Sequence, residues 1–165
     1  MLSIMIFLPL IAAVLALFLS ANGARWTALL ATLANFALGI ALWVAYDPAG
    51  PQWQFVELVG GGGILSWALG IDGIALMLIM LSVFLMPICI GASWTSIARR
   101  VPEYMAAFLL MEALMIGVFA AQDLLLFYIF FEGGLIPMYL IIGILTAKLA
   151  KKASHSHHCR LGAKS

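Results

Sequence analysis

The chain has 165 residues, of which 65% are hydrophobic and 9% are charged, and its formal net charge is +1. Soluble domains carry about 25% charged residues, so this composition, with a mean hydropathy of +1.16, excludes a soluble globular domain. The two cysteines, Cys89 and Cys159, make no disulfide framework. We therefore expect an all-α protein that crosses a membrane several times and has no nucleic-acid partner.

Five apolar runs are predicted to span the membrane, because about 20 helical residues cross a hydrocarbon core of ~30 Å. A turn at Ser20–Arg25 separates the first two runs, and the longest connection, Asp47–Ile71, follows the second. We expect that connection to form a short β-hairpin or a lid on the membrane surface, with Gly60–Gly63 as its turn. The predicted spans cover about residues 2–19, 26–44, 72–94, 104–121 and 124–145.

Two polar residues have predicted structural roles. Asp72 precedes the third span, where a negative charge favours the first turn of a helix. Asn35 lies near the middle of the second span, and we expect it to make an interhelical hydrogen bond rather than to act in catalysis.

The fifth span contains one carboxylate, Glu132, near the middle of its apolar run. A charged side chain at that depth costs about 2.5–3.5 kcal/mol, which indicates ion or proton handling. Pro137 has no N–H, so the carbonyl of Gly133 loses its helical partner, and the glycines allow water or another helix to approach. We predict that Glu132 is a proton relay in a helix opened by Gly133, Gly134 and Pro137. The alternative is a neutral Glu132 that serves packing only.

A second carboxylate, Glu112, lies in the middle of the fourth span. The connection at Gln122 and Asp123 is so short that the fourth and fifth spans should be antiparallel neighbours. Glu112 and Glu132 would then lie at similar depth and could share water or a proton if they face each other. Glu112 is thus a possible second relay carboxylate. The alternative is a structural Glu112 held by the hydroxyl or amide of a neighbour.

The basic residues predict the orientation, because those of a membrane protein gather on its cytoplasmic side. With five spans, all eight fall on one side, which places the N-terminus outside and the C-terminus in the cytoplasm. The tail, residues 148–165, should be basic and disordered, and its His155, His157, His158 and Cys159 lack a fold that could hold a metal. The basic residues are Arg25, Arg99, Arg100, Lys148, Lys151, Lys152, Arg160 and Lys164.

The segment FLLMEALMIGVFAAQDLLLFYIFFEGGLIPMYLIIG (Phe108–Gly143) resembles the family of subunit M of bacterial NADH:quinone oxidoreductase, or respiratory complex I. This antiporter-like, proton-translocating subunit is called subunit 4 in mitochondria. The segment LGIDGIAL (Leu69–Leu76) resembles the start of the family's corresponding helix. The resemblance covers about Met1–Gly143 and implies a bacterial inner membrane, or alternatively the mitochondrial inner membrane.

The resemblance implies that Glu132 matches the essential glutamate of the family's fifth helix, which pairs with a lysine on a later, broken helix. It also implies that proton transfer is driven by quinone reduction in other subunits. Those subunits would hold NADH, flavin, iron–sulfur clusters and quinone, whereas this chain would bind no cofactor and no metal. The implied partners are the other membrane subunits of complex I, including neighbouring antiporter-like subunits, and lipid.

The resemblance ends near Gly143, and residues 144–165 do not resemble the family's continuation into a sixth helix. We therefore expect a truncated or frameshifted chain. No lysine lies within the five predicted spans, so Glu132 has no cationic partner there, and we expect the chain alone to conduct no protons. The alternatives are a subunit of an Mrp-type cation/proton antiporter and a non-functional remnant.

Overall fold

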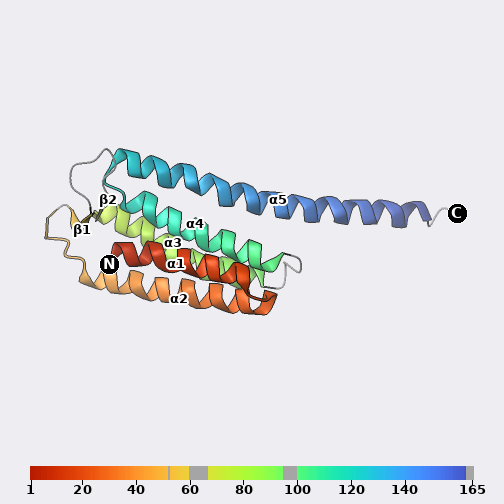
Figure 1. Ribbon diagram of the computed structural model, residues 1–165, viewed down its shortest axis with the longest axis horizontal. Coiled ribbons are helices and arrows are strands. Elements are labelled where there is room, and N and C mark those ends of the chain that lie inside the picture. The colour runs from red at the N-terminus through yellow and green to blue at the C-terminus, as the bar shows by residue number, and fades with distance from the viewer. Residues whose placement is uncertain (52, 60–66, 95–99, 163–165) are drawn as a thin grey trace.

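The computed structural model describes residues 1–51, 53–59, 67–94 and 100–162 of the chain, and its helices form a bundle with a small hairpin at one end (Figure 1). The elements are α1 (Leu2–Phe18), α2 (Ala21–Ala45), β1 (Gln54–Val59), β2 (Trp67–Ile71), α3 (Gly73–Ser93), α4 (Val101–Ala120) and α5 (Leu124–Gly162).

Four helices are long and apolar enough to cross a membrane, namely α2, α3, α4 and the Leu124–Gly143 part of α5. The fifth predicted span, α1, is an apolar helix of 17 residues. At 1.5 Å per residue it measures about 25 Å, slightly less than the ~30 Å of a hydrocarbon core. The prediction of an all-α, multi-pass membrane protein is confirmed.

Helix α4 lies at the centre of the bundle, where it packs against α1, α2, α3 and α5. Of its most apolar 18-residue window, 56% is buried, compared with 17% for α5. Small side chains allow the helices of this core to approach closely, which is how helices associate where lipid removes the hydrophobic driving force. The small residues of this core are Ala12, Ala13, Ala16, Ala24, Ala28, Ala31 and Ala106.

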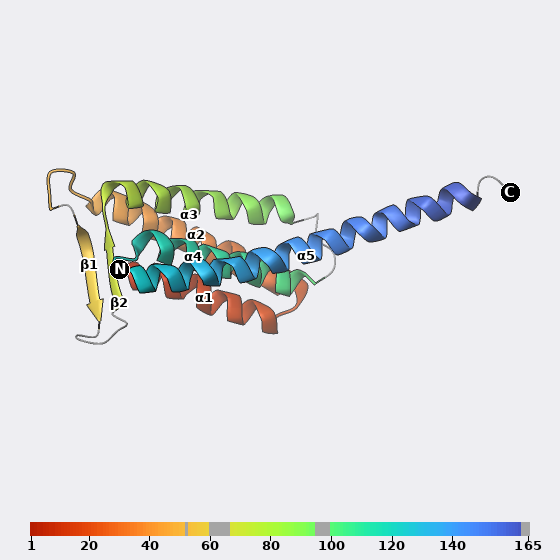
Figure 2. The same cartoon turned by 90° about the horizontal axis from the view of Figure 1, so that it is seen from above.

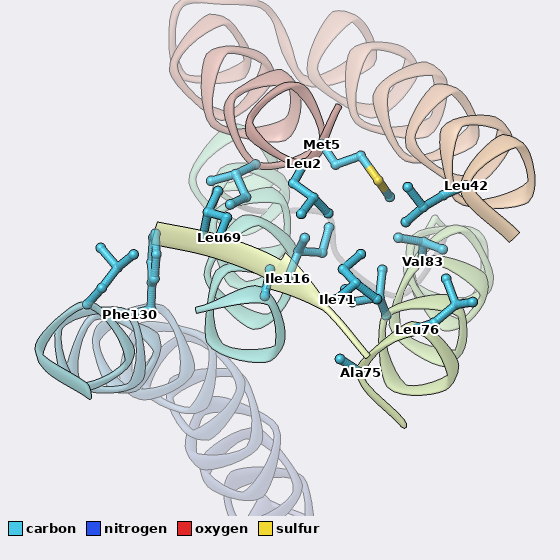
Figure 3. Packing of buried hydrophobic residues seen from close by; sticks show 14 residues of the cluster. Leu2, Met5, Leu42, Leu69, Ile71, Ala75, Leu76, Val83, Ile116 and Phe130 are labelled. Carbon is cyan, nitrogen blue, oxygen red and sulfur yellow. The ribbon is translucent and has the colours of Figure 1, made fainter. Parts of the chain in front are cut away.

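The predicted hairpin is present, and it crosses one end of the bundle (Figure 2). β1 pairs antiparallel with β2, with Glu57 opposite Leu69 and Val59 opposite Trp67. Leu69 and Ile71 are fully buried because β2 directs them into the apolar core of the helices (Figure 3). The neighbours that Figure 3 labels around them include Leu2, Met5, Leu42, Val83, Ile116 and Phe130.

Glu57 fastens the hairpin to α1 by capping the beginning of that helix. Its carboxylate accepts hydrogen bonds from the backbone N–H of Leu2 at 2.9 Å and of Ser3 at 3.0 Å. The Ser3 hydroxyl and the Met1 amino group also donate to it. The first N–H groups of a helix have no partner within the helix, so a carboxylate on β1 satisfies them from 55 residues away.

Trp67 connects the hairpin to two helices. Its ring stacks on Phe7 of α1 at 5.7 Å and meets Phe130 of α5 edge to face at 5.8 Å, while Nε1 donates to Ser3 Oγ at 3.3 Å. The backbone N–H of Gln122, between α4 and α5, donates to the Ala68 carbonyl at 2.9 Å. The hairpin therefore holds α1, α4 and α5 together at one end.

Several local predictions can be compared with these elements. Asp72 is the N-cap of α3, and its carboxylate accepts from the N–H of Ala75 at 2.7 Å, as the sequence predicts. The turn predicted at Ser20–Arg25 is wrong, because α2 already begins at Ala21. The glycine run Gly60–Gly63 and Arg99 lie outside the described residues.

The predicted disordered tail is instead helical, since the backbone of α5 continues to Gly162. Its 39 residues extend well past the other helices (Figure 1). Residues 147–153 read AKLAKKA, and alanine, leucine and lysine are among the best helix formers, so nothing in this stretch ends the helix. The prediction of disorder rests on the Lys-, Ser- and His-rich composition and on the lack of an apolar period, neither of which prevents a helix.

Candidate functional site

Glu112 lies inside the bundle, on the face of α4 that meets α2. Its side chain is 0% exposed, and so is that of Asn35 on α2. Asn35 Nδ2 donates to Glu112 Oε1 at 3.0 Å. The predicted interhelical hydrogen bond of Asn35 is confirmed, and its partner is the second candidate carboxylate.

The only other buried polar side chain among the described residues is that of Thr32, one turn before Asn35. Its hydroxyl bonds to the carbonyls of its own helix, those of Ala28 at 3.1 Å and Leu29 at 3.0 Å. By contrast, Asn35 Oδ1 and Glu112 Oε2 are buried without a hydrogen-bond partner among the described residues. The Thr32 hydroxyl therefore has its hydrogen bonds, whereas Asn35 and Glu112 each keep one buried oxygen without a hydrogen-bond partner among the described residues.

Glu132 has the opposite environment, because its side chain is exposed on the outer surface of α5. Tyr128, one turn earlier on the same face, is 61% exposed and interacts with the Glu132 carboxylate. In the part of the chain that the structure describes, no helix packs over this face. Whatever surrounds Glu132 in a membrane comes from lipid or from protein outside these residues.

The three residues predicted to open α5 have different surroundings. Gly133 faces α4, where a Cβ on it would lie 3.2 Å from Leu114 Cδ2, while a Cβ on Gly134 would meet nothing within 4 Å. Pro137 is buried, and the helix continues through it. Because proline lacks an N–H, the carbonyl of Gly133 still has no donor at the usual helical position.

Glu112 and Glu132 do not face each other, so the structure does not bring the two candidate relay residues together. Leu114 faces α5, because Gly133 packs against it. Two residues along a helix correspond to a rotation of about 200°, so Glu112 lies on the side of α4 away from α5. The short connection between α4 and α5 makes these helices neighbours, as expected, but it does not determine which faces meet.

Metal ligands do not gather in the part of the chain that the structure describes. The described residues contain no group of three or more His, Cys, Asp or Glu that could hold a metal ion. His155, His157, His158 and Cys159 lie where only the backbone is described. The candidate site therefore consists of two carboxylates, one buried and amide-bound, the other exposed on an edge helix.

This fold and this site define a class of protein, namely an all-α, multi-pass membrane protein with a carboxylate near the middle of each of two apolar helices. Residues 1–121 match the family model described as NADH-ubiquinone oxidoreductase chain 4, amino terminus. The chain belongs to this family.

Two curated relatives of the family are similar to the chain in sequence. It is 51% identical over 155 residues to NADH-quinone oxidoreductase subunit M of Rhodobacter capsulatus, covering 90% of this chain and 30% of that protein. It is 40% identical over 157 residues to NADH-ubiquinone oxidoreductase chain 4 of Prototheca wickerhamii. That match covers 83% of this chain and 30% of that protein. The chain thus spans about 30% of the length of these curated relatives.

A solved structure has the same fold. A chain of respiratory complex I from Thermus thermophilus with bound NADH superimposes with a TM-score of 0.69 and 30% identity, covering 85% of this chain and 28% of that one. The relatives include bacterial and mitochondrial proteins, and the apolar helices fit a multi-pass protein of an inner membrane.

Proposed function

We propose that this chain is the N-terminal part of a membrane subunit of a proton-translocating NADH:quinone oxidoreductase. The observation that carries the proposal is the 51% identity with subunit M of Rhodobacter capsulatus over 90% of the chain. In this function, quinone reduction in other subunits drives proton transfer through carboxylates within the membrane. The chain itself would bind no redox cofactor. NADH, flavin, iron–sulfur clusters and quinone would be held by its partners.

Glu132 is the proposed proton relay of this chain. Its exposed face on α5 supports the role, because the chain spans about 30% of its relatives and a longer subunit has further residues to cover this face. A carboxylate covered in this way could exchange protons with groups on those residues, whereas one left in lipid could not. The partners would be the other membrane subunits of complex I, including neighbouring antiporter-like subunits, together with lipid.

Glu112 is proposed as a second relay carboxylate. Its burial beside Asn35 and its position on the side of α4 away from α5 mean that any exchange with Glu132 needs an intermediate group or water. The proposed orientation places the hairpin outside and Arg25, Arg99 and Arg100 in the cytoplasm. The membrane would be a bacterial inner membrane, with the mitochondrial inner membrane as the alternative.

A chimera tests this function. Residues 1–143 of this chain replace the matching part of subunit M in Rhodobacter capsulatus, and NADH oxidation and proton uptake are measured in inverted membrane vesicles. We expect the chimera to restore both activities. Replacing Glu132→Gln should reduce proton uptake to that of vesicles lacking subunit M, because the amide keeps the shape but cannot exchange a proton.

The matched control is Glu103→Gln, since Glu103 is exposed at the beginning of α4 and pairs with Arg100 at 3.5 Å. It should leave proton uptake unchanged. An assembled chimera in which Glu132→Gln retains proton uptake would contradict the proposed relay. In liposomes that contain only the 165-residue chain, we expect no flux that depends on Glu132.

A further inference from the structure

The contact between Asn35 and Glu112 leaves one oxygen atom on each side chain without a hydrogen-bond donor among the described residues. Asn35 Nδ2 donates to Glu112 Oε1 at 3.0 Å, which leaves Asn35 Oδ1 and Glu112 Oε2 buried and unsatisfied. Both side chains are 0% exposed. Most buried polar atoms in proteins have a hydrogen-bond partner, so two orphans on one contact require an explanation.

The charged form of Glu112 does not provide one. A buried carboxylate needs a cation or several donors, and here it has one neutral amide donor. No lysine or arginine occurs between Arg25 and Arg99 or between Arg100 and Lys148, so the helix interiors supply no cation. The other buried polar group, that of Thr32, is engaged with its own helix.

One proton satisfies both orphans. Carboxyl and amide groups are planar, and a protonated carboxyl can donate as well as accept. We propose that Asn35 holds Glu112 as a neutral acid in a cyclic pair, in which Asn35 Nδ2 donates to Glu112 Oε1 and protonated Oε2 donates to Asn35 Oδ1. Asn35 is thus a positioning residue, which determines the oxygen that carries the proton.

The pair has two consequences. It joins α2 to α4 through two parallel hydrogen bonds between side chains that are 0% exposed. It also retains the proton, because Oε2 can release it only when the bond to Asn35 Oδ1 opens. This second consequence rests on the proposed relay function, whereas the pair itself does not.

Infrared spectroscopy tests the pair directly. The 165-residue chain is purified into lipid nanodiscs, and the C=O stretching region of protonated carboxyl groups is recorded at neutral pH. We expect a band that Glu112→Gln removes. Replacing Asn35→Leu should move this band to higher wavenumber, because Oε1 loses its N–H donor. Asn35→Ser, a smaller change, should also move it and is measured in case Asn35→Leu does not fold.

The matched control is Thr32→Val, which removes a buried hydroxyl from the same helix, one turn from Asn35, that is not bonded to Glu112. It should leave the band in place. A spectrum that Glu112→Gln does not change would show a charged Glu112 and overturn the proposal. A band that stays in place when Asn35 is replaced would exclude Asn35 as the partner.

These outcomes are independent of the proposed function. A chimera in which Glu132→Gln still takes up protons would refute the relay and leave the spectrum unchanged. In the chimera, Glu112→Gln should preserve assembly, because two amides form the same two hydrogen bonds. An assembled Glu112→Gln chimera that no longer takes up protons would show that the proton held by Glu112 takes part in proton transfer.

Discussion

Helices α4 and α5 resemble each other in sequence and differ in environment. Each has a mostly apolar stretch of about 20 residues with one carboxylate near its middle, yet 56% of the α4 window is buried and 17% of the α5 window. The bundle provides Glu112 with a partner on α2, whereas Glu132 is on the outer face. A glutamate near the middle of an apolar helix is therefore part of the buried core in α4 and an exposed side chain in α5.

The largest difference between the two helices is expected when both carboxylates are truncated. Replacing Glu112→Ala leaves a cavity and removes the hydrogen-bond partner of the Asn35 amide. We expect this variant to lower the free energy of unfolding by roughly 2–4 kcal/mol. Glu132→Ala removes an exposed side chain and should change the stability of the isolated chain by less than about 0.5 kcal/mol. The measurement is unfolding of the purified chain in detergent, followed by tryptophan fluorescence.

The control for the first variant is Glu112→Gln, which keeps both volume and hydrogen bonds and should recover most of the lost stability. Equal losses for Glu112→Ala and Glu132→Ala would show that the two carboxylates have similar environments, against the structure.

A pair of glycines extends the comparison to packing. A Cβ on Gly117 of α4 would lie 2.7 Å from Phe130 Cδ1 of α5, and that ring is held by Trp67. Gly117→Ala should therefore push α5 away and cost about 1–3 kcal/mol. Gly134→Ala, on the open side of α5, should be neutral or stabilise by up to ~1 kcal/mol through helix propensity. The same unfolding measurement applies, and a destabilising Gly134→Ala would contradict the open surface described for α5.

A third carboxylate, Glu57, lies outside the spans. Burial alone would raise the pKa of Glu57, but hydrogen bonds from the Met1 amino group and Ser3 and the charge of that amino group lower it from 4.5 to about 2. Its contribution to stability is therefore present above pH 4.5 and is lost as the pH falls from 4.5 towards 2. Glu57→Gln should cost about 0.5–2 kcal/mol at pH 7, the usual range for a helix cap.

The measurement for Glu57 is the free energy of unfolding of both chains at pH 7 and at about pH 3. The difference between the wild-type chain and Glu57→Gln should shrink at the lower pH. A difference that stays constant with pH would show that the charge of Glu57 does not cap α1.

Much of this fold can be predicted from the sequence, because long apolar runs, the Asp72 cap and the hairpin are local patterns. The faces of the helices cannot be predicted in this way. Lipid-facing and protein-facing positions of α4 and α5 are equally apolar, so periodicity does not reveal where Glu112 and Glu132 point. The sequence indicates Asn35 and Glu112 as separate polar residues, but their pairing depends on how α2 packs against α4.

The cap on α1 was not predicted either. Glu57 lies on the first strand of the predicted hairpin, and no spacing rule links it to a helix 55 residues earlier. The signal that could have found it is the absence of an acidic or N-capping residue at the beginning of α1. The first N–H groups of such a helix bond to water or to a group from elsewhere in the chain, and in α1 that group is the Glu57 carboxylate.

The cap supplied by Glu57 sets an order of assembly. The first turn of α1 is synthesised early, but its carboxylate partner arrives only after α2 has been made and β1 has reached the same end of the bundle. Until then the start of α1 has unpaired N–H groups that must stay hydrated or near lipid headgroups. The beginning of α1 is thus expected to reach its final hydrogen bonding only once β1 is in place, so a helix that is made first is completed by a strand that is made later.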